Sequence, residues 1–251
     1  VLFRFLRLEG DAAMPVQNIE PRLRYCADWG LLVQLGDSID PELNAWTRLA
    51  ADKMRDLALP GVQEVVPAYA SFLVIYDPLQ LEPERLKQAV LSCCQDQSPE
   101  DLLQHARTVR IPVCYQGQHA PDIQDVAKIH SLSVQQVINI HCEPEYLIYM
   151  LGFAPGFPYL GGLDPRLHTP RLDTPRQQVP SGSVGIAGSQ TGIYPLASPG
   201  GWRIIGRTPL RLFAPELDCP VPYYAPGDKL QFYPVDQQEF QRLQQEEGYG
   251  E

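Results

Sequence analysis

The sequence lacks the short motifs that mark the commonest catalytic and nucleotide-binding sites. It contains no P-loop (G-x-x-x-x-G-K-[ST]), no dinucleotide-binding G-x-G-x-x-G and no G-x-S-x-G nucleophile elbow. Its 6 cysteines include no C-x-x-C pair, so neither a zinc site nor a disulfide framework is indicated. We therefore expect free thiols in a reducing, cytoplasmic environment and no metal site.

Lysine and glutamate are absent from one long segment. Between Tyr146 and Pro215 there are six arginines and two aspartates, but no lysine or glutamate. Arginine grips carboxylates and phosphates at two points, whereas lysine is a mobile point charge. The bias predicts an anion-binding site; alternatively, the arginines brace loop carbonyls and pair with acidic residues elsewhere. The net charge of -10 and the pI near 5.0 disfavour nucleic acid and anionic membranes as partners.

Within that segment, the residues from Gly152 to Arg207 are dense in glycine and proline. They also include large aromatic side chains such as Phe157, Tyr194 and Trp202. These can bury surface, which a disordered linker of similar glycine and proline content could not do. We therefore expect glycine and proline to shape the backbone here, and we place the functional site in this stretch.

The 251 residues are enough for two modest domains. Over residues 14–105 the pattern predicts strand, strand, helix, strand, strand, helix, with Asp40 capping the first helix and Pro83 opening the second. Such a unit is typical of an α+β sandwich of the ferredoxin-like kind. Residues 1–13 are predicted to be a disordered extension, and the polar segment 95–106 a linker.

Residues 106–251 are predicted to form a second, β-barrel domain. Short strands with Gly/Pro corners, among them Thr108–Tyr115, Leu210–Phe213 and Lys229–Tyr233, favour a barrel. Two short helices are expected after the first of these strands. Ser133 and Gln136 have the spacing of a capping box that opens the second helix.

Pro-Arg pairs recur at five-residue intervals, at Arg166, Arg171 and Arg176. A five-residue step turns successive side chains to different faces of an extended segment, so all three cannot reach one pocket. We choose Arg176, the one nearest to the glycine loop that follows. That loop begins with Ser181, Gly182 and Ser183, and its backbone N–H groups could bind a phosphate or an oxyanion.

Three further side chains complete the candidate site. His141 is predicted at the end of a helix immediately before the Gly/Pro-rich stretch, where it is either an acid/base or a structural histidine. Gln190 and Tyr194 follow the glycine loop and supply neutral polar groups.

Three segments are long and specific enough to indicate a family: GFAPGFPYLGGLDPRL, TPRQQVPSGSVGIAGSQTGIYPLASPGGWRIIGRTP and, together with them, the later APGD. With them the chain resembles the family that holds the B subunit of 5-oxoprolinase, allophanate hydrolase subunit 1 and the sporulation-kinase inhibitor of bacilli. The resemblance runs from Met14 to about Phe240. One departure is Tyr115-Gln116-Gly117, where relatives tend to carry Tyr-Gly-Gly.

The resemblance implies a ferredoxin-like N-terminal domain, a cyclophilin-like β-barrel and a partner subunit of related barrel fold. The family's 5-oxoprolinase members work with that partner and a third, hydrolase subunit. Together they open 5-oxo-L-proline to L-glutamate at the expense of ATP, and the lactam is thought to be activated by phosphorylation.

On this resemblance, Arg176 and Arg207 are expected to contact anionic groups, Gln190 and Tyr194 to orient the lactam, and His141 to act as acid/base. The sequence shows no P-loop lysine and no evident cluster of magnesium carboxylates. We therefore expect the partner subunit to complete the site for ATP and Mg²⁺.

Two other functions stay open within the family. A carboxyl-transfer subunit of the allophanate hydrolase or urea carboxylase type would need biotin, and this chain has no Met-Lys-Met biotinylation site of its own. A regulatory protein that inhibits a sensor histidine kinase would act through surface contacts.

Overall fold

The computed structural model describes residues 20–95, 106–213 and 223–246. The described residues divide into two compact units, one of residues 20–38 and 46–95 and one of residues 39–45, 106–213 and 223–246. The extension predicted at 1–13 and nearly all of the linker predicted at 95–106 lie outside the described residues. The domain boundary predicted between residues 105 and 106 therefore stays a prediction.

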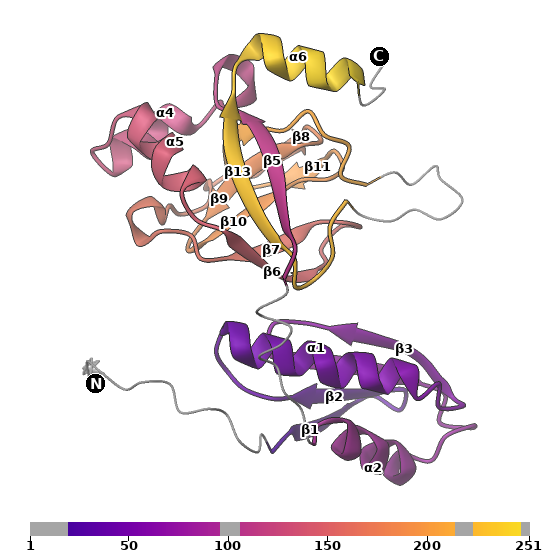
Figure 1. Ribbon diagram of the computed structural model, residues 1–251. Coiled ribbons are helices and arrows are strands. Elements are labelled where there is room, and N and C mark those ends of the chain that lie inside the picture. Colours follow the sequence, from indigo (N-terminus) through magenta and orange to yellow (C-terminus); the bar gives the residue numbers. More distant parts are fainter. Residues whose placement is uncertain (1–19, 96–105, 214–222, 247–251) are drawn as a thin grey trace, which may run out of the picture. The chain divides into compact units, whose positions relative to one another are not determined.

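The first unit is a four-stranded antiparallel sheet with two helices, and its strand order is β1-β2-β4-β3 (Figure 1). Its elements are β1 (Arg22–Cys26), β2 (Gly30–Gln34), α1 (Pro41–Asp56, of which residues 41–45 are assigned to the second unit), β3 (Val62–Pro67), β4 (Ser71–Tyr76) and α2 (Pro83–Cys93). One face of the sheet is buried, because Leu31 and Val33 of β2 lie opposite Val74 and Phe72 of β4 and all four are inaccessible to solvent.

The predicted order of elements in this unit is confirmed, and so is the α+β class. A ferredoxin-like unit runs β-α-β-β-α-β, whereas here the order is β-β-α-β-β-α: β1 comes first and forms one edge of the sheet, and none of the four strands of the sheet follows α2. Strands β2 and β3 are joined through α1 and separated in the sheet by β4, which is antiparallel to both. That arrangement contains a split β-α-β unit, and the ferredoxin-like classification stays a prediction.

The helix starts lie where the capping residues predict them. The Asp40 carboxylate accepts a hydrogen bond from the Leu43 backbone N–H at 2.9 Å, which caps α1. In the second unit, Ser133 Oγ accepts from the Gln136 N–H at 3.2 Å, and Gln136 Oε1 accepts from the Ser133 N–H at 2.8 Å. This is the predicted capping box, and it opens α5 (Val134–Cys142).

The second unit is built on a closed barrel in the order β10-β7-β6-β13-β5-β12-β9, which confirms the predicted barrel. Its strands are β5 (Thr108–Cys114), β6 (Tyr146–Leu151), β7 (Pro158–Gly161), β9 (Ser183–Ala187), β10 (Gln190–Ile193), β12 (Arg203–Arg207) and β13 (Lys229–Val235). The segment Leu210–Phe213, predicted as a strand, is irregular, which corrects that prediction.

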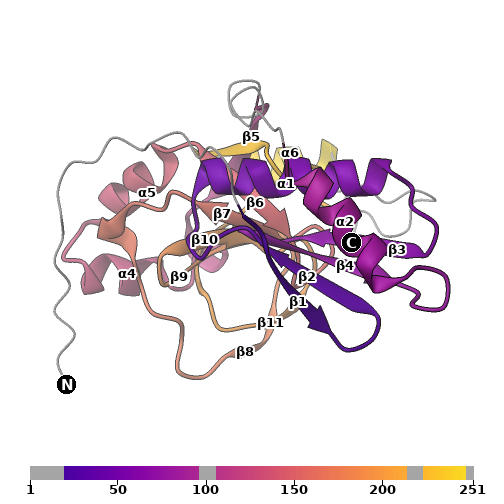
Figure 2. The ribbon, with the colours of Figure 1, turned by 90° about the horizontal axis from the view of Figure 1, so that it is seen from below.

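The first and last strands of the barrel, β5 and β13, lie side by side and parallel (Figure 1). Helices α4 (Ile123–Ile129) and α5 pack against each other beside the barrel (Figure 2), and α6 (Gln237–Glu246) follows β13. A separate two-stranded ribbon is formed by β8 (Arg176–Val179) and β11 (Ser198–Gly200). Most of the Gly/Pro-rich stretch therefore forms barrel strands, this ribbon and the turns between them.

The capping box gives a direct test of the fold. Ser133→Ala should lower the free energy of unfolding by about 1 kcal/mol, because it removes the acceptor for one N–H group at the start of α5. Ser133→Asp keeps a capping oxygen and should stay close to the wild type. Urea denaturation measures both, and equal losses in the two variants would contradict the capping role.

Candidate functional site

An aromatic pocket opens in the barrel unit within the Gly/Pro-rich stretch. It has a volume of about 360 Å³, and its lining residues are Phe153, Phe157, Tyr159, Arg171, Pro175, Tyr194, Pro199, Gly200, Gly201 and Trp202. Phe157 is the centre of the cluster: its ring meets those of Tyr159, Tyr194 and Trp202 edge to face, with centroids 5.3 to 5.5 Å apart. Edge-to-face packing of this kind favours a fixed arrangement of rings. The walls of the pocket are therefore aromatic and largely apolar.

Glycine allows these rings to pack directly on the strands. A Cβ at Gly200 would lie 2.4 Å from the phenol oxygen of Tyr194, so Tyr194 occupies the space that any other residue would fill. A Cβ at Gly192 would lie 3.1 Å from both Phe157 and Trp202. These two glycines thus make room for the aromatic rings of the pocket.

Arg171 is the one charged residue in the pocket lining. Its two neighbours in the Pro-Arg repeat are engaged elsewhere: Arg166 makes a two-point contact with Asp164, and Arg176 pairs with Asp122. Within the described part of the chain, no hydrogen bond or ion pair is formed by Arg171. The repeat thus presents one arginine to the pocket, and it is Arg171 in place of the predicted Arg176.

Arg176 has a structural position. Its guanidinium donates to the Asp122 carboxylate at 2.6 Å and to the Trp202 carbonyl at 3.4 Å. The other Asp122 oxygen accepts from the Ile204 backbone N–H at 2.6 Å, and only 7% of the Asp122 side chain is exposed. A buried carboxylate needs such partners, so Arg176 follows the alternative stated for these arginines, that of pairing with an acidic residue elsewhere.

The backbone groups of the glycine loop are hydrogen-bonded to other atoms of the protein. The Gly182 N–H donates to the Tyr194 carbonyl at 2.7 Å, and the Ser183 N–H donates to the Pro180 carbonyl at 3.2 Å. The Ser181 hydroxyl donates to the Pro195 carbonyl at 2.7 Å, and Arg207 Nε to the Ser181 carbonyl at 2.8 Å. These bonds brace a turn with Gly182 at φ +80°, so the N–H groups of Gly182 and Ser183 do not form the predicted anion cradle.

Ser181 and Arg207 also line a second hollow, of about 20 Å³. That volume is close to the minimum for a single water molecule. It is too small for a lactam or a phosphate, so this hollow does not provide the expected anion site.

His141 lies fully buried in the barrel core. Its Nε2 is 2.9 Å from the Thr191 hydroxyl, which itself donates to the Gly185 carbonyl, and its Nδ1 is 2.8 Å from the Tyr115 hydroxyl. The network assigns the proton to Nε2, so that Nδ1 accepts from Tyr115. Burial lowers the pKa of His141 to about 3. This is a neutral structural histidine, the other reading of its position, and it is unsuited to act as acid/base at neutral pH.

Of the predicted trio Arg176, Gln190 and Tyr194, only Tyr194 lines the aromatic pocket. Gln190 begins β10 and pairs with Ala187 across the hairpin. Burial raises the pKa of Tyr194, against the opposing effects of the Trp202 backbone and of Arg171 and Arg176. Tyr194 is therefore a protonated phenol at neutral pH and a possible hydrogen-bond donor. The predicted residues do not converge on one concavity.

Sequence reasoning missed Arg171 and Phe153 as pocket residues. Asp164 lies two residues before Arg166 and pairs with it, but Asp173 lies two residues after Arg171, so the sequence around the repeat did not single out Arg171. The partner of Arg176 is 54 residues away in sequence, and no local pattern indicates it.

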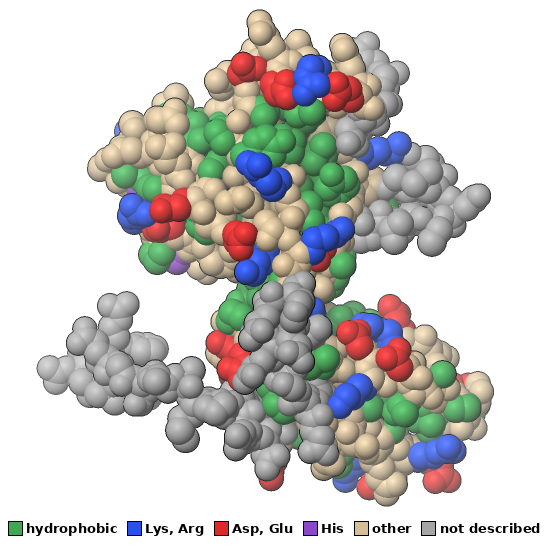
Figure 3. Space-filling model, in the orientation of Figure 1, with side chains coloured by type: hydrophobic (Ala, Val, Ile, Leu, Met, Phe, Trp, Pro, Cys, Tyr) green, Lys and Arg blue, Asp and Glu red, His purple; other side chains and the backbone are tan. Residues whose placement is uncertain are grey.

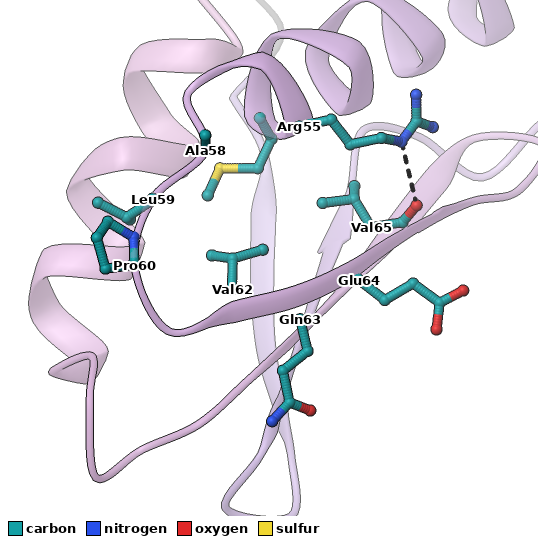
Figure 4. Close-up of a pocket in the computed structure, with 9 residues that line it drawn as sticks. Arg55, Ala58, Leu59, Pro60, Val62, Gln63, Glu64 and Val65 are labelled. Atoms are coloured by element: carbon teal, nitrogen blue, oxygen red, sulfur yellow. Dashed lines mark hydrogen bonds between the residues drawn. The ribbon is translucent and has the colours of Figure 1, made fainter.

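A larger hollow of about 560 Å³ lies in the first unit, between the end of α1 and the edge strand β3 (Figure 4). Its walls are mostly apolar, with Leu59, Pro60 and Val62 facing it, whereas Gln63 and Glu64 point away. Arg55 contacts the Val65 carbonyl at 3.5 Å. The one carboxylate in its lining, that of Glu64, points away from it (Figure 4).

The described residues do not fit a complete site for ATP and Mg²⁺. No group of three or more His, Cys, Asp or Glu side chains is placed to hold a metal ion within residues 20–95, 106–213 and 223–246. The aromatic pocket has one arginine, and the N–H groups of Gly182 and Ser183 are already bonded. A triphosphate with its metal needs several cationic side chains, backbone N–H groups and metal-binding carboxylates. These residues alone do not supply them.

Positive and negative side chains are mixed on one face of the molecule (Figure 3). On the face drawn in Figure 3, Lys and Arg side chains are interspersed with Asp and Glu, with patches of hydrophobic side chains between them. Nucleic-acid binding requires a concentrated basic patch. No helix in the described part of the chain has the length and apolar character needed to cross a bilayer.

A family model and a curated protein both match most of the chain. Residues 21–223 match the family model of the carboxyltransferase domain, subdomain C and D. The chain is 39% identical over 238 residues to the B subunit of 5-oxoprolinase from Bacillus subtilis, covering 91% of this chain and 99% of that protein.

Solved structures show the same fold. A crystal structure of TTHA0988 matches 86% of this chain with a TM-score of 0.73 and 35% identity, and the match spans 40% of that chain. The urea carboxylase of Kluyveromyces lactis matches 94% of this chain with a TM-score of 0.72 at 20% identity, over 24% of its own length. At that identity the similarity concerns the fold alone. This chain thus corresponds to less than half of each of these two longer chains.

The Asp122–Arg176 pair yields a prediction about stability. Arg176→Ala should lower the free energy of unfolding by about 3 kcal/mol, since it leaves a buried carboxylate without its counter-charge. Asp122→Asn combined with Arg176→Gln should recover part of that loss. Arg166→Ala, at an exposed pair, is the matched control and should cost under about 1 kcal/mol. Equal losses for Arg176→Ala and Arg166→Ala in urea denaturation would contradict the structural role.

His141 makes stability depend on pH. Its pKa is lowered from 6.5 to about 3 by burial, so between these values the unfolded chain binds a proton that the folded chain does not. Stability is therefore complete above pH 6.5 and falls by up to about 1.4 kcal/mol per pH unit as the pH drops toward 3.

From pH 6.5 to 5, His141→Gln should lose roughly 1.5 kcal/mol less stability than the wild type, because the variant lacks the titrating group. Urea denaturation at the two pH values measures the difference. Equal pH dependence in the two proteins, or an imidazole NMR titration of His141 near pH 6.5, would refute this assignment.

Proposed function

Since this chain belongs to the carboxyltransferase domain family, subdomain C and D, that includes the B subunit of 5-oxoprolinase, we propose that it is a subunit of an ATP-dependent 5-oxoprolinase. The enzyme would open 5-oxo-L-proline to L-glutamate after phosphorylation of the lactam. The observation that carries this proposal is the near-full-length similarity to the Bacillus subtilis protein. The other two subunits would be a partner of related barrel fold and a third, hydrolase subunit.

The aromatic pocket supports a substrate-binding role for this subunit. Its aromatic lining offers apolar surface to a small ligand, and Tyr194 keeps its proton at neutral pH because burial raises its pKa. A protonated phenol can donate to a lactam oxygen that gains negative charge. We propose this orienting role for Tyr194, as expected from the sequence, and leave Gln190, Arg207 and His141 outside the substrate contacts.

The partner subunit is proposed to supply the site for ATP and Mg²⁺. The reason is the poor fit of the described residues to a triphosphate and its metal. The activity would then require the complex, and this chain alone would bind substrate without turning it over. The cytoplasmic location expected from the cysteines belongs to the same proposal.

A carboxyl-transfer role is the second candidate, because the matching family model is a carboxyltransferase domain and the fold recurs in urea carboxylase. Biotin would then have to be carried by another protein. Bicarbonate dependence and inhibition by avidin distinguish this role from lactam hydrolysis.

The deciding experiment is ATP-dependent release of glutamate from 5-oxo-L-proline, followed with glutamate dehydrogenase. We expect turnover only when this chain, its partner, the third subunit and ATP with Mg²⁺ are all present. Omission of each component in turn is the control. Undiminished turnover without this chain, or a folded and associated complex that releases no glutamate, would refute the proposal.

A further inference from the structure

Phe153 combines an unfavourable backbone with an exposed ring. Its φ is +65°, in the left-handed region that bulky residues avoid, and 68% of the residue is exposed. Such a conformation is energetically unfavourable and persists only where its surroundings impose it. Burial of the ring offsets little of that cost, so folding alone does not account for phenylalanine at this position.

The turn between β6 and β7 imposes the conformation. Its backbone is held by three hydrogen bonds: Gly152 N–H to the Phe157 carbonyl at 3.1 Å, Ala154 N–H to the Gly152 carbonyl at 2.7 Å, and Phe157 N–H to the Ala154 carbonyl at 3.0 Å. The ring of Phe153 meets that of Phe157 edge to face, with centroids 5.5 Å apart. The turn thus presents an aromatic ring at the mouth of the pocket.

The only charge in the pocket lining comes from Arg171. Within the described ranges it makes no ion pair or hydrogen bond, whereas Arg166, Arg176 and Arg203 are bonded to protein oxygens. A guanidinium without a protein partner is a natural site for a carboxylate. The cavity of about 360 Å³ is at the small end of ligand sites, and one arginine matches a single negative charge.

We propose that this pocket binds a small flat ring carrying one carboxylate, with Phe153 covering the ring and Arg171 holding the carboxylate. The five aromatic side chains of the lining supply faces and edges for a planar ring, and the absence of acidic lining residues leaves Arg171 uncompensated. 5-Oxo-L-proline, a five-membered lactam with one carboxylate, is a member of this class. The choice of that compound rests on the proposed function; the chemical class does not.

Binding is tested by calorimetry on the full chain. The probes are 5-oxo-L-proline, pyrrole-2-carboxylate, which keeps a flat ring and a carboxylate, and 2-pyrrolidinone, which keeps the lactam but lacks the carboxylate. Both carboxylates should bind, and 2-pyrrolidinone at least tenfold more weakly. Arg171→Gln should weaken both carboxylates at least tenfold. Arg242→Gln, in α6 and outside the lining, is the control and should change nothing.

Phe153→Leu keeps an apolar side chain without the ring and should weaken binding about threefold to tenfold. Phe153→Gly also removes the ring but fits the left-handed backbone, so it should bind weakly and melt higher than Phe153→Ala. In the reconstituted complex, Phe153→Leu should raise KM and leave kcat unchanged.

The outcomes separate this inference from the proposed function. Failure of both carboxylates to bind the wild-type chain, or equal binding by the wild type and the Phe153 and Arg171 variants, overturns the inference even where the complex releases glutamate. Carboxylate binding that depends on Phe153 and Arg171, without glutamate release by the complete mixture, supports the inference and refutes the proposed function.

Discussion

The buried carboxylate of Asp122 is the interaction on which the ligand site depends. It joins the start of α4 to β12 through the Ile204 N–H, and to the β8–β11 ribbon through Arg176. Gly200 of β11 lies opposite Arg176 in that ribbon, and Gly200 makes the space that Tyr194 occupies. A charge withdrawn from water must keep its counter-charge, so this pair holds the ribbon, and with it one wall of the aromatic pocket, in place.

The roles of the arginines in the stretch differ according to whether each guanidinium is paired with a carboxylate. Arg166 has Asp164 two residues away, and Arg176 has Asp122 on another element. Arg171 has Asp173 two residues away, but within the described residues it pairs with no carboxylate, and it lines the pocket. The arginines of this stretch therefore include both structural residues and the proposed ligand-binding residue Arg171. The distinction between them lies in the distribution of carboxylates in the folded chain, since a paired guanidinium has little left to offer a ligand.

Several polar groups that could have served catalysis are used to hold the barrel together. His141 bridges Tyr115 and Thr191 in the core, and the turn at Gly182 binds its own backbone groups. Their hydrogen bonds offset the cost of burying polar atoms in a small closed barrel. What is left at the surface is a pocket suited to holding a ligand, with few groups that could transform it. Such a division fits a subunit whose chemistry is completed by another protein.

Local signals in the sequence were enough to predict most of the helices and strands. The capping residues Asp40 and Ser133 and the period-two strands predict the helices and strands, and the long Gly/Pro-rich motifs indicate the family, because each depends on residues near one another in the chain. Which polar side chains are left without a protein partner depends instead on contacts made in the folded chain. Asp122 selects Arg176 from 54 residues away, and closure of the barrel buries His141. The backbone of the β6–β7 turn brings Phe153 to the pocket through a left-handed conformation that no preference of phenylalanine predicts. Pairing and burial of this kind depend on contacts between distant segments, which a local pattern does not encode.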